Sequence, residues 1–220
     1  MEVDTSDEDV VHWRAVSGTN VDGKKYAEEL MIPYSDRLSE RISQPLWIGV
    51  QEAMNNVKHH AYIMPRNSNF ASKVSATDRW WMFSQEKDGK LTVLICDLGA
   101  GIPRTVPKTK RESLAPVIRW MRLHKRSDGA VLSAVLKQTV LKERPSDSAD
   151  SASRTGLLNR GKGFYNIVKT VRAIDGGAVV IHSNSGYWRS LKPGEQENNT
   201  YKNSIGGTIV SWQIPLKDPS

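Results

Sequence analysis

Residues 51–61, which read QEAMNNVKHHA, decide how the rest of the chain is organised. Through this stretch and the residues before it, apolar side chains recur at intervals of three or four, the period of a helix with one buried stripe. Proline is tolerated in the first turn of a helix but not deep inside one. The sequence therefore predicts a helix that begins near Ser43–Pro45 and ends before Pro65. Its buried stripe consists of Leu46, Val50, Ala53, Val57 and Ala61.

A second row on the same helix is polar. Glu52, Asn56 and His60 are spaced four residues apart, and each such step rotates a helix by only about 40°. The row therefore lies beside the buried stripe, where polar groups are costly to desolvate unless they bind something. A rival row at positions 51, 55 and 59 points away from the stripe. We expect the Glu52 row to face a ligand.

The composition is that of a globular protein. The chain has 220 residues, 38% hydrophobic and 25% charged, which suffices for one substantial core. No apolar run approaches the roughly 20 residues that span a bilayer, and the acidic N-terminus does not resemble a secretory signal. Cys96 is the single cysteine, which excludes an internal disulfide and a cysteine-rich metal site. We expect a cytoplasmic protein without membrane contact.

The formal net charge of +7 permits contact with nucleic acid or another acidic partner. The basic residues are spread along the chain, with one modest cluster at residues 104–111. A solvated surface explains such a charge better than a nucleic-acid site does. Nucleic acid is therefore not favoured as a partner.

Other periodic segments surround the central helix. Two alternating stretches, residues 79–86 and 90–97, flank a tight-turn signal at Lys87-Asp88-Gly89 and predict a hairpin. Residues 112–142 predict two helices broken at Ser127–Gly129, and residues 144–153 are expected to be mobile. The other predictions are a strand at 10–16, a short helix at 37–42, a helix that opens at 159–166 and runs to Ile174, a strand at 178–183, a polar excursion at 184–205 and a closing strand at 206–215. This order predicts an α+β fold, a two-layer α/β sandwich with helices on one face of a mainly antiparallel sheet.

Asp97, Gly99 and Gly101 directly follow an apolar strand. Glycine lets the backbone approach a ligand closely, and a carboxylate accepts a hydrogen bond from an exocyclic amine. The same pattern also fits an aspartate that caps its own turn, so both interpretations stay open from this segment alone. A dinucleotide-binding fingerprint is excluded because its third glycine is missing.

Residues 156–163, GLLNRGKG, come close to a P-loop. They differ from it at Gly163, where the P-loop needs the hydroxyl of Ser or Thr. The segment is instead a glycine-rich turn leading into a helix, whose N-terminus offers unpaired amides and a positive dipole end to phosphates. Arg160 and Lys162 add positive charge there.

Together these segments resemble the GHKL ATPases, the family of gyrase, the large heat-shock chaperones, histidine kinases and MutL. The row of Glu52, Asn56 and His60 is similar to the N box of that family. The segment 97–102 is similar to its first glycine box and the segment 160–164 to its second. Gly207-Thr208 is similar to its terminal Gly-Thr motif. The matches occur in the family's order and extend from residue 40 to residue 216.

The resemblance implies the Bergerat fold, with Mg-ATP held between sheet and helices under a lid at residues 104–160. It implies that Asn56 ligates Mg²⁺ and that Glu52 is the general base. Asp97 would hold the adenine amino group, with Thr208 nearby. The nucleotide-binding residues that it implies are Asn56, His60, Asp97, Gly99, Gly101, Ile102, Arg160, Gly161, Lys162, Gly163, Phe164 and Thr208.

Residues 1–34 are expected to form an N-terminal extension with one strand, and residues 35–220 the ATP-binding domain. The expected function is that of an ATPase or protein kinase acting on a partner protein, with ATP and Mg²⁺ as cofactors. Two alternatives stay open: an ATP-gated protein-interaction switch with little turnover, and the ATP-binding piece of a larger sensor-kinase-like system. The expected partners are ATP and a protein, and a homodimer is compatible with the sequence.

Overall fold

Seven strands of the described chain form one antiparallel sheet in the order β1-β2-β3-β7-β4-β5-β6. The computed structural model describes residues 11–19, 30, 32–64, 79–109, 112–123, 125–142, 163–172, 176–192 and 195–217. The strands are β1 (Val11–Gly18), β2 (Trp80–Lys87), β3 (Lys90–Asp97), β4 (Ala178–Ser183), β5 (Gly186–Lys192), β6 (Glu195–Thr200) and β7 (Thr208–Pro215).

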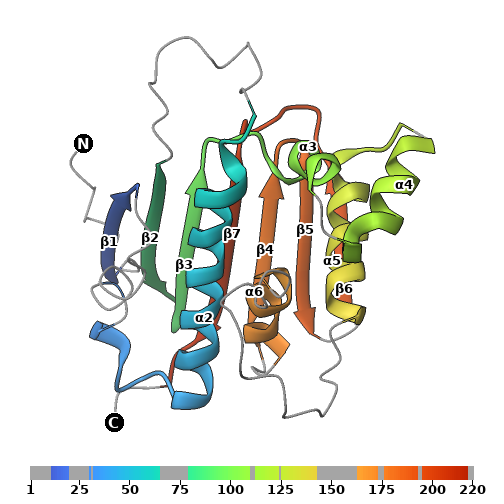
Figure 1. The fold of residues 1–220 in the computed structure, drawn as a ribbon. Helices are drawn as coiled ribbons and strands as arrows, with labels where there is room; N and C mark the ends of the chain where they lie inside the picture. The colour runs from blue at the N-terminus through green and yellow to red at the C-terminus, as the bar shows by residue number, and fades with distance from the viewer. Residues whose placement is uncertain are drawn as a thin grey trace, which may run out of the picture.

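The helices form a second layer on one face of this sheet. Figure 1 shows α2, α6 and α5 side by side in front of the strands, with α4 at the outer edge of that layer. The α+β class and the predicted antiparallel sheet are therefore confirmed. The helices are α2 (Glu40–Asn56), α3 (Ile102–Thr105), α4 (Ala115–Leu123), α5 (Asp128–Lys142) and α6 (Gly163–Arg172). A π-helical turn, η2 (Val57–Ala61), continues α2, and short 3₁₀ turns lie at η1 (Ile32–Tyr34), η4 (Val106–Lys108) and η5 (Glu112–Leu114).

The core lies between the two layers. Burial alternates along β2, β3 and β7, as expected for strands with one face against helices. All five residues of the predicted helical stripe, 46, 50, 53, 57 and 61, are buried. The stripe prediction is confirmed, and it fixes which side of α2 meets the sheet.

The hairpin prediction is also confirmed. β2 and β3 pair from Trp80↔Asp97 to Lys87↔Lys90. The two turn residues have positive φ, 50° at Asp88 and 67° at Gly89, the conformation that a two-residue type I′ turn requires. At the edge of the sheet, β1 corresponds to the strand predicted at 10–16.

The predicted start of the main helix was wrong. α2 begins at Glu40, so Pro45 lies inside it. The amides of Ile42 and Ser43 already donate to the carbonyl of Ser39, at 2.8 and 2.9 Å, which closes a helical turn before the proline. The short helix predicted at 37–42 is absent, because residues 35–37 form a turn that leads into α2.

The polar excursion predicted at 184–205 was also wrong, because it contains β5 and β6. Every residue of β6 is exposed, so this edge strand has no apolar pattern from which it could be recognised. It is defined by its pairing with β5, the strand directly before it in the chain.

Two helices occupy residues 112–142 as predicted, with α4 ending at Leu123 and α5 starting at Asp128. α5 packs against β5 and β6, and its Leu132, Val135 and Leu136 are fully buried. A helix packed this deeply belongs to the body of the fold, which narrows the part of residues 104–160 that can serve as a lid. No helix among the described residues has the length and apolar character to cross a membrane.

Candidate functional site

A cavity of about 330 Å³ lies where the two layers meet above the end of α2. Its walls come from α2 with η2, from β3 and β7, from residues 101–109 with Leu114, and from α6. The volume falls in the range of ligand pockets, about 300–1,000 Å³. Most lining side chains are apolar. The polar ones come from α2 with η2, from β3 and β7, and from residues 105–109. The predicted residues that line it are Asn56, His60, Asp97, Gly101, Ile102, Phe164 and Thr208.

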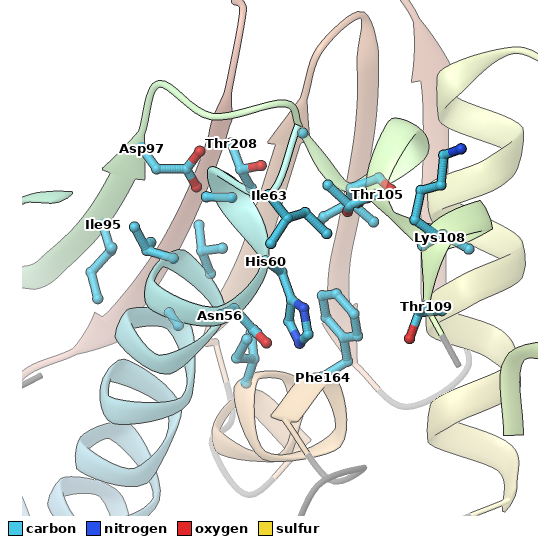
Figure 2. Close-up of a pocket in the computed structure, with 18 of the residues that line it drawn as sticks. Asn56, His60, Ile63, Ile95, Asp97, Thr105, Lys108, Thr109, Phe164 and Thr208 are labelled. Atoms are coloured by element: carbon cyan, nitrogen blue, oxygen red, sulfur yellow. Dashed lines mark hydrogen bonds between the residues drawn. The ribbon is translucent and has the colours of Figure 1, made fainter. Parts of the chain in front are cut away.

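One end of the cavity is polar because three strands present small polar side chains in one row. Asp97 of β3 pairs with Thr208 of β7, which pairs with Ser183 of β4, so all three side chains share the helix-facing side. All three are buried. The hydroxyls of Ser183 and Thr208 are 3.0 Å apart, and Ser183 accepts a hydrogen bond from the amide of Ile102 at 2.7 Å. Figure 2 shows Asp97 and Thr208 side by side there.

The turn after β3 holds Asp97 in place. Its Oδ1 accepts a hydrogen bond from the amide of Gly99 at 2.8 Å. The next amide, of Ala100, donates to the carbonyl of Ala61 at 2.7 Å and ties the turn to the end of η2. The capping role considered from the sequence is thus present, while the side chain also lines the cavity.

The two glycines of this turn have different roles. Gly99 does not line the cavity: a Cβ there would lie 2.3 Å from the carbonyl oxygen of Ala61, so glycine is needed for the contact between turn and helix. Gly101 lines the cavity with φ +78°, and a Cβ there would lie 2.5 Å from the Nδ2 of Asn184. Asn184 in turn donates to the carbonyl of Ala100 at 3.0 Å.

A second group of polar residues lies at the other end of the cavity. Figure 2 shows Asn56 and His60 there, facing Phe164 of α6. Both side chains line the cavity, whereas positions 51 and 59 of the rival row are exposed. The structure therefore directs the Glu52 row toward the cavity.

Glu52 belongs to α2. It does not line the cavity but lies beside the start of α6. Its Oε1 accepts a hydrogen bond from the Nδ2 of Asn166 at 3.2 Å. A Cβ on Gly163 would lie 3.2 Å from the Oε2 of Glu52 and 3.6 Å from the amide of Asn56. The first residue of α6 is therefore packed against both members of the row. Trp212 fixes the helix to the sheet, since its Nε1 donates to the carbonyl of Ile167 at 2.9 Å.

Some predicted residues have no structural placement, and some lining residues were not predicted. Arg160, Gly161 and Lys162 lie outside the described residues. Lys108, Thr105 and Thr109 line the cavity, and Lys108 belongs to the basic cluster recognised in the sequence. Ser183 and Asn184 do not line the cavity but support it, and they were missed because only the folded sheet brings Ser183 beside Thr208 and Asn184 beside Ala100.

Cys96, next to Asp97 in β3, does not line the cavity. Burial, reinforced by the negative charge of Asp97, raises the pKa of the Cys96 thiol to about 11, so this thiol stays neutral near pH 7. Within the described part of the chain, no three His, Cys, Asp or Glu side chains are grouped as metal ligands. A Mg²⁺ ion held by the carboxamide oxygen of Asn56 would therefore take its other ligands from phosphate oxygens and water, as Mg²⁺ commonly does.

Comparison with known proteins gives no family assignment: no protein-family model matches the chain, and no curated protein matches it. The function of the cavity must therefore be inferred from the residues around it.

Proposed function

We propose that this protein binds Mg-ATP in the cavity, as a GHKL-type domain with the Bergerat fold, and acts as an ATPase or protein kinase on a partner protein. The observation that carries the proposal is the convergence of Asp97, Asn56 and Phe164 on one cavity from distant parts of the chain, with Gly163 packed beside Asn56. A cytoplasmic location, where ATP is available, is part of the proposal.

The row of Asp97 and Thr208 suits an adenine ring. A carboxylate accepts a hydrogen bond from the exocyclic amine, and a hydroxyl can donate one to a ring nitrogen. The apolar side chains of Ile95, Ile102 and Val210, which also line the cavity, supply flat packing surfaces for the base. Buried polar groups surrounded by apolar walls give orientation and specificity to a pocket.

The opposite end suits phosphates. α6 begins at Gly163 beside Asn56, and a helix N-terminus directs unpaired amides and a positive dipole toward anions. Lys108 also lines the cavity, and its ammonium, which points away from Asn56 and Phe164 in Figure 2, would have to turn toward this end to add positive charge. The carboxamide oxygen of Asn56 would hold Mg²⁺, which neutralises charge on the phosphates during transfer.

Thermal melting with Mg-ATP tests this proposal. At 100 times its dissociation constant, a ligand stabilises the folded protein by about 2.7 kcal/mol, which raises the melting temperature of a chain of this size by about 5–10 °C. Asn56→Ala is expected to abolish the magnesium-dependent part of this shift without unfolding the protein. Asn55→Ala, one position along the same helix, is the matched control and should retain the full shift. A wild-type protein that Mg-ATP does not stabilise would contradict the proposal.

Asp97→Asn tests the adenine end. Asparagine keeps an acceptor for the amide of Gly99 but turns the second oxygen into a donor, which would then face the adenine amine. We expect ATP binding to weaken by about 30-fold, since a hydrogen bond to a charged group contributes about 1.5–3 kcal/mol. Inosine triphosphate, whose O6 is an acceptor, should lose much less affinity. Equal losses for both nucleotides would show that Asp97 only caps its own turn.

A further inference from the structure

α4 and the residues after it form a second basic cluster, which the spread of basic residues along the sequence did not single out. The segment 113–127 contains no aspartate or glutamate, and its four strongly basic side chains are all exposed: Arg119, Arg122, Lys125 and Arg126. None of them forms an ion pair within the described residues. Of the flanking acids, Glu112 is exposed, whereas the carboxylate of Asp128 accepts a hydrogen bond from the amide of Ser185 at 3.0 Å. The charge of this surface is therefore largely uncompensated.

The apolar side of α4 packs against the core of the protein. Val117 is buried, and Ile118, Trp120 and Met121 pack against the core. The guanidinium of Arg126 lies 4.4 Å from the centre of the Trp120 ring, which covers that ring and holds the cation in place. Leu123 is the single large apolar side chain of the described α4 segment that is strongly exposed.

This distribution discriminates between classes of partner. An interfacial helix buries an apolar face in the membrane, but that face of α4 is packed on the protein. The centre of a protein–protein interface is depleted in charge and enriched in apolar and aromatic side chains, and Leu123 alone supplies too little such surface. A polyanion, by contrast, can bind through exposed cationic side chains alone, and α4 supplies these.

We propose that α4 with Lys125 and Arg126 is a docking surface for the phosphate backbone of a nucleic acid, bound without regard to base sequence. Arg119 and Arg122 are three residues apart on one helix face, where side chains are neighbours. Arginine pairs with phosphate in a bidentate manner. The net charge of +7 adds long-range attraction. α4 also contacts η4, whose exposed Lys108 extends the basic surface toward the cavity.

Fluorescence anisotropy with a labelled 20-base-pair duplex of mixed sequence, and with the corresponding single strand, tests this surface. The full chain should bind at least one of them with a dissociation constant of about 1–100 µM near physiological salt. Arg119→Glu/Arg122→Glu should weaken binding at least about tenfold. It should also reduce the slope of log K against log salt by about 1.4–1.8, the loss expected for two phosphate contacts.

Lys87→Glu/Lys90→Glu is the matched control, since it changes the net charge by the same amount. Both lysines are exposed and flank the β2–β3 turn, at the end of the sheet away from α4 in Figure 1. Binding by this control should fall less than about threefold. Melting temperatures of both variants establish whether they are folded. If the Arg119→Glu/Arg122→Glu variant is not folded, the milder Arg119→Gln/Arg122→Gln variant is measured in its place.

Three results would overturn the proposal. The first is no binding of either nucleic acid at 100 µM protein. The second is an equal loss in both charge-reversed variants, which would indicate net charge rather than α4. The third is α4-dependent binding to vesicles containing phosphatidylserine without binding to nucleic acid. Because the assay contains no ATP, its failure leaves the proposed nucleotide site untouched, and failure of the melting test leaves α4 untouched.

Discussion

Glu52→Gln is expected to lower the rate of ATP hydrolysis by about 10²–10⁴-fold, the usual contribution of a positioned general base. The carboxylate would take the proton from the attacking water, which an amide cannot do. Glutamine has the same size, and its carbonyl oxygen can still accept the hydrogen bond that Asn166 donates to Glu52 at 3.2 Å. ATP affinity should therefore stay within a few-fold of that of the wild type.

The measurement is phosphate release at saturating Mg-ATP, with ATP affinity determined separately for each variant. Glu112→Gln provides the control because Glu112 is an exposed carboxylate away from the row. An unchanged hydrolysis rate in Glu52→Gln would remove Glu52 from the reaction. A wild-type protein that binds ATP but never turns it over, alone or with partners, would favour the interaction switch over the enzyme.

Local periodicity explains why much of the fold could be predicted. The stripe and the polar row of α2 follow from spacing along one helix, and the hairpin follows from the alternation that flanks Asp88-Gly89. These features need no knowledge of distant parts of the chain. The same local spacing predicted that Asn56 and His60 share one side of the helix, and both line the cavity.

Features that depend on pairing between distant segments could not be predicted. β6 was missed for another reason: it pairs with the strand directly before it, β5, but it is exposed along its whole length and so carries no apolar alternation. Ser183 lies beside Thr208 through the register of β4 with β7, which no local pattern encodes. The π-helical turn η2 was also missed, since the spacing of 57 and 61 suits a continuous α-helix equally well.

Gly99 has a different physical role from the one that the family resemblance implies. The resemblance implies that Gly99 binds the nucleotide, but Gly99 does not line the cavity. Its φ is not positive either, unlike that of Gly101. What excludes a side chain at this position is the close approach of the carbonyl of Ala61.

Gly99→Ala is therefore expected to destabilise the protein by about 2–3 kcal/mol, the upper range for overpacking. The added Cβ would lie 2.3 Å from the carbonyl oxygen of Ala61 and 2.5 Å from its carbonyl carbon. Both are backbone atoms, so no side-chain rotation can relieve the clash. The turn must move away from η2, which breaks the 2.7 Å hydrogen bond from the amide of Ala100 to Ala61.

Gly89→Ala separates this contact from glycine's conformational freedom. Gly89 has φ +67°, and a Cβ there would meet nothing within 4 Å, so alanine should cost only the backbone strain of about 1–2 kcal/mol. Chemical denaturation of both variants gives the two free energies of unfolding. If Gly99→Ala costs no more than Gly89→Ala, the turn can shift away from Ala61 at little cost. The helix end bearing His60 would then not be held against the Asp97 turn, and the two ends of the cavity would not be fixed relative to each other.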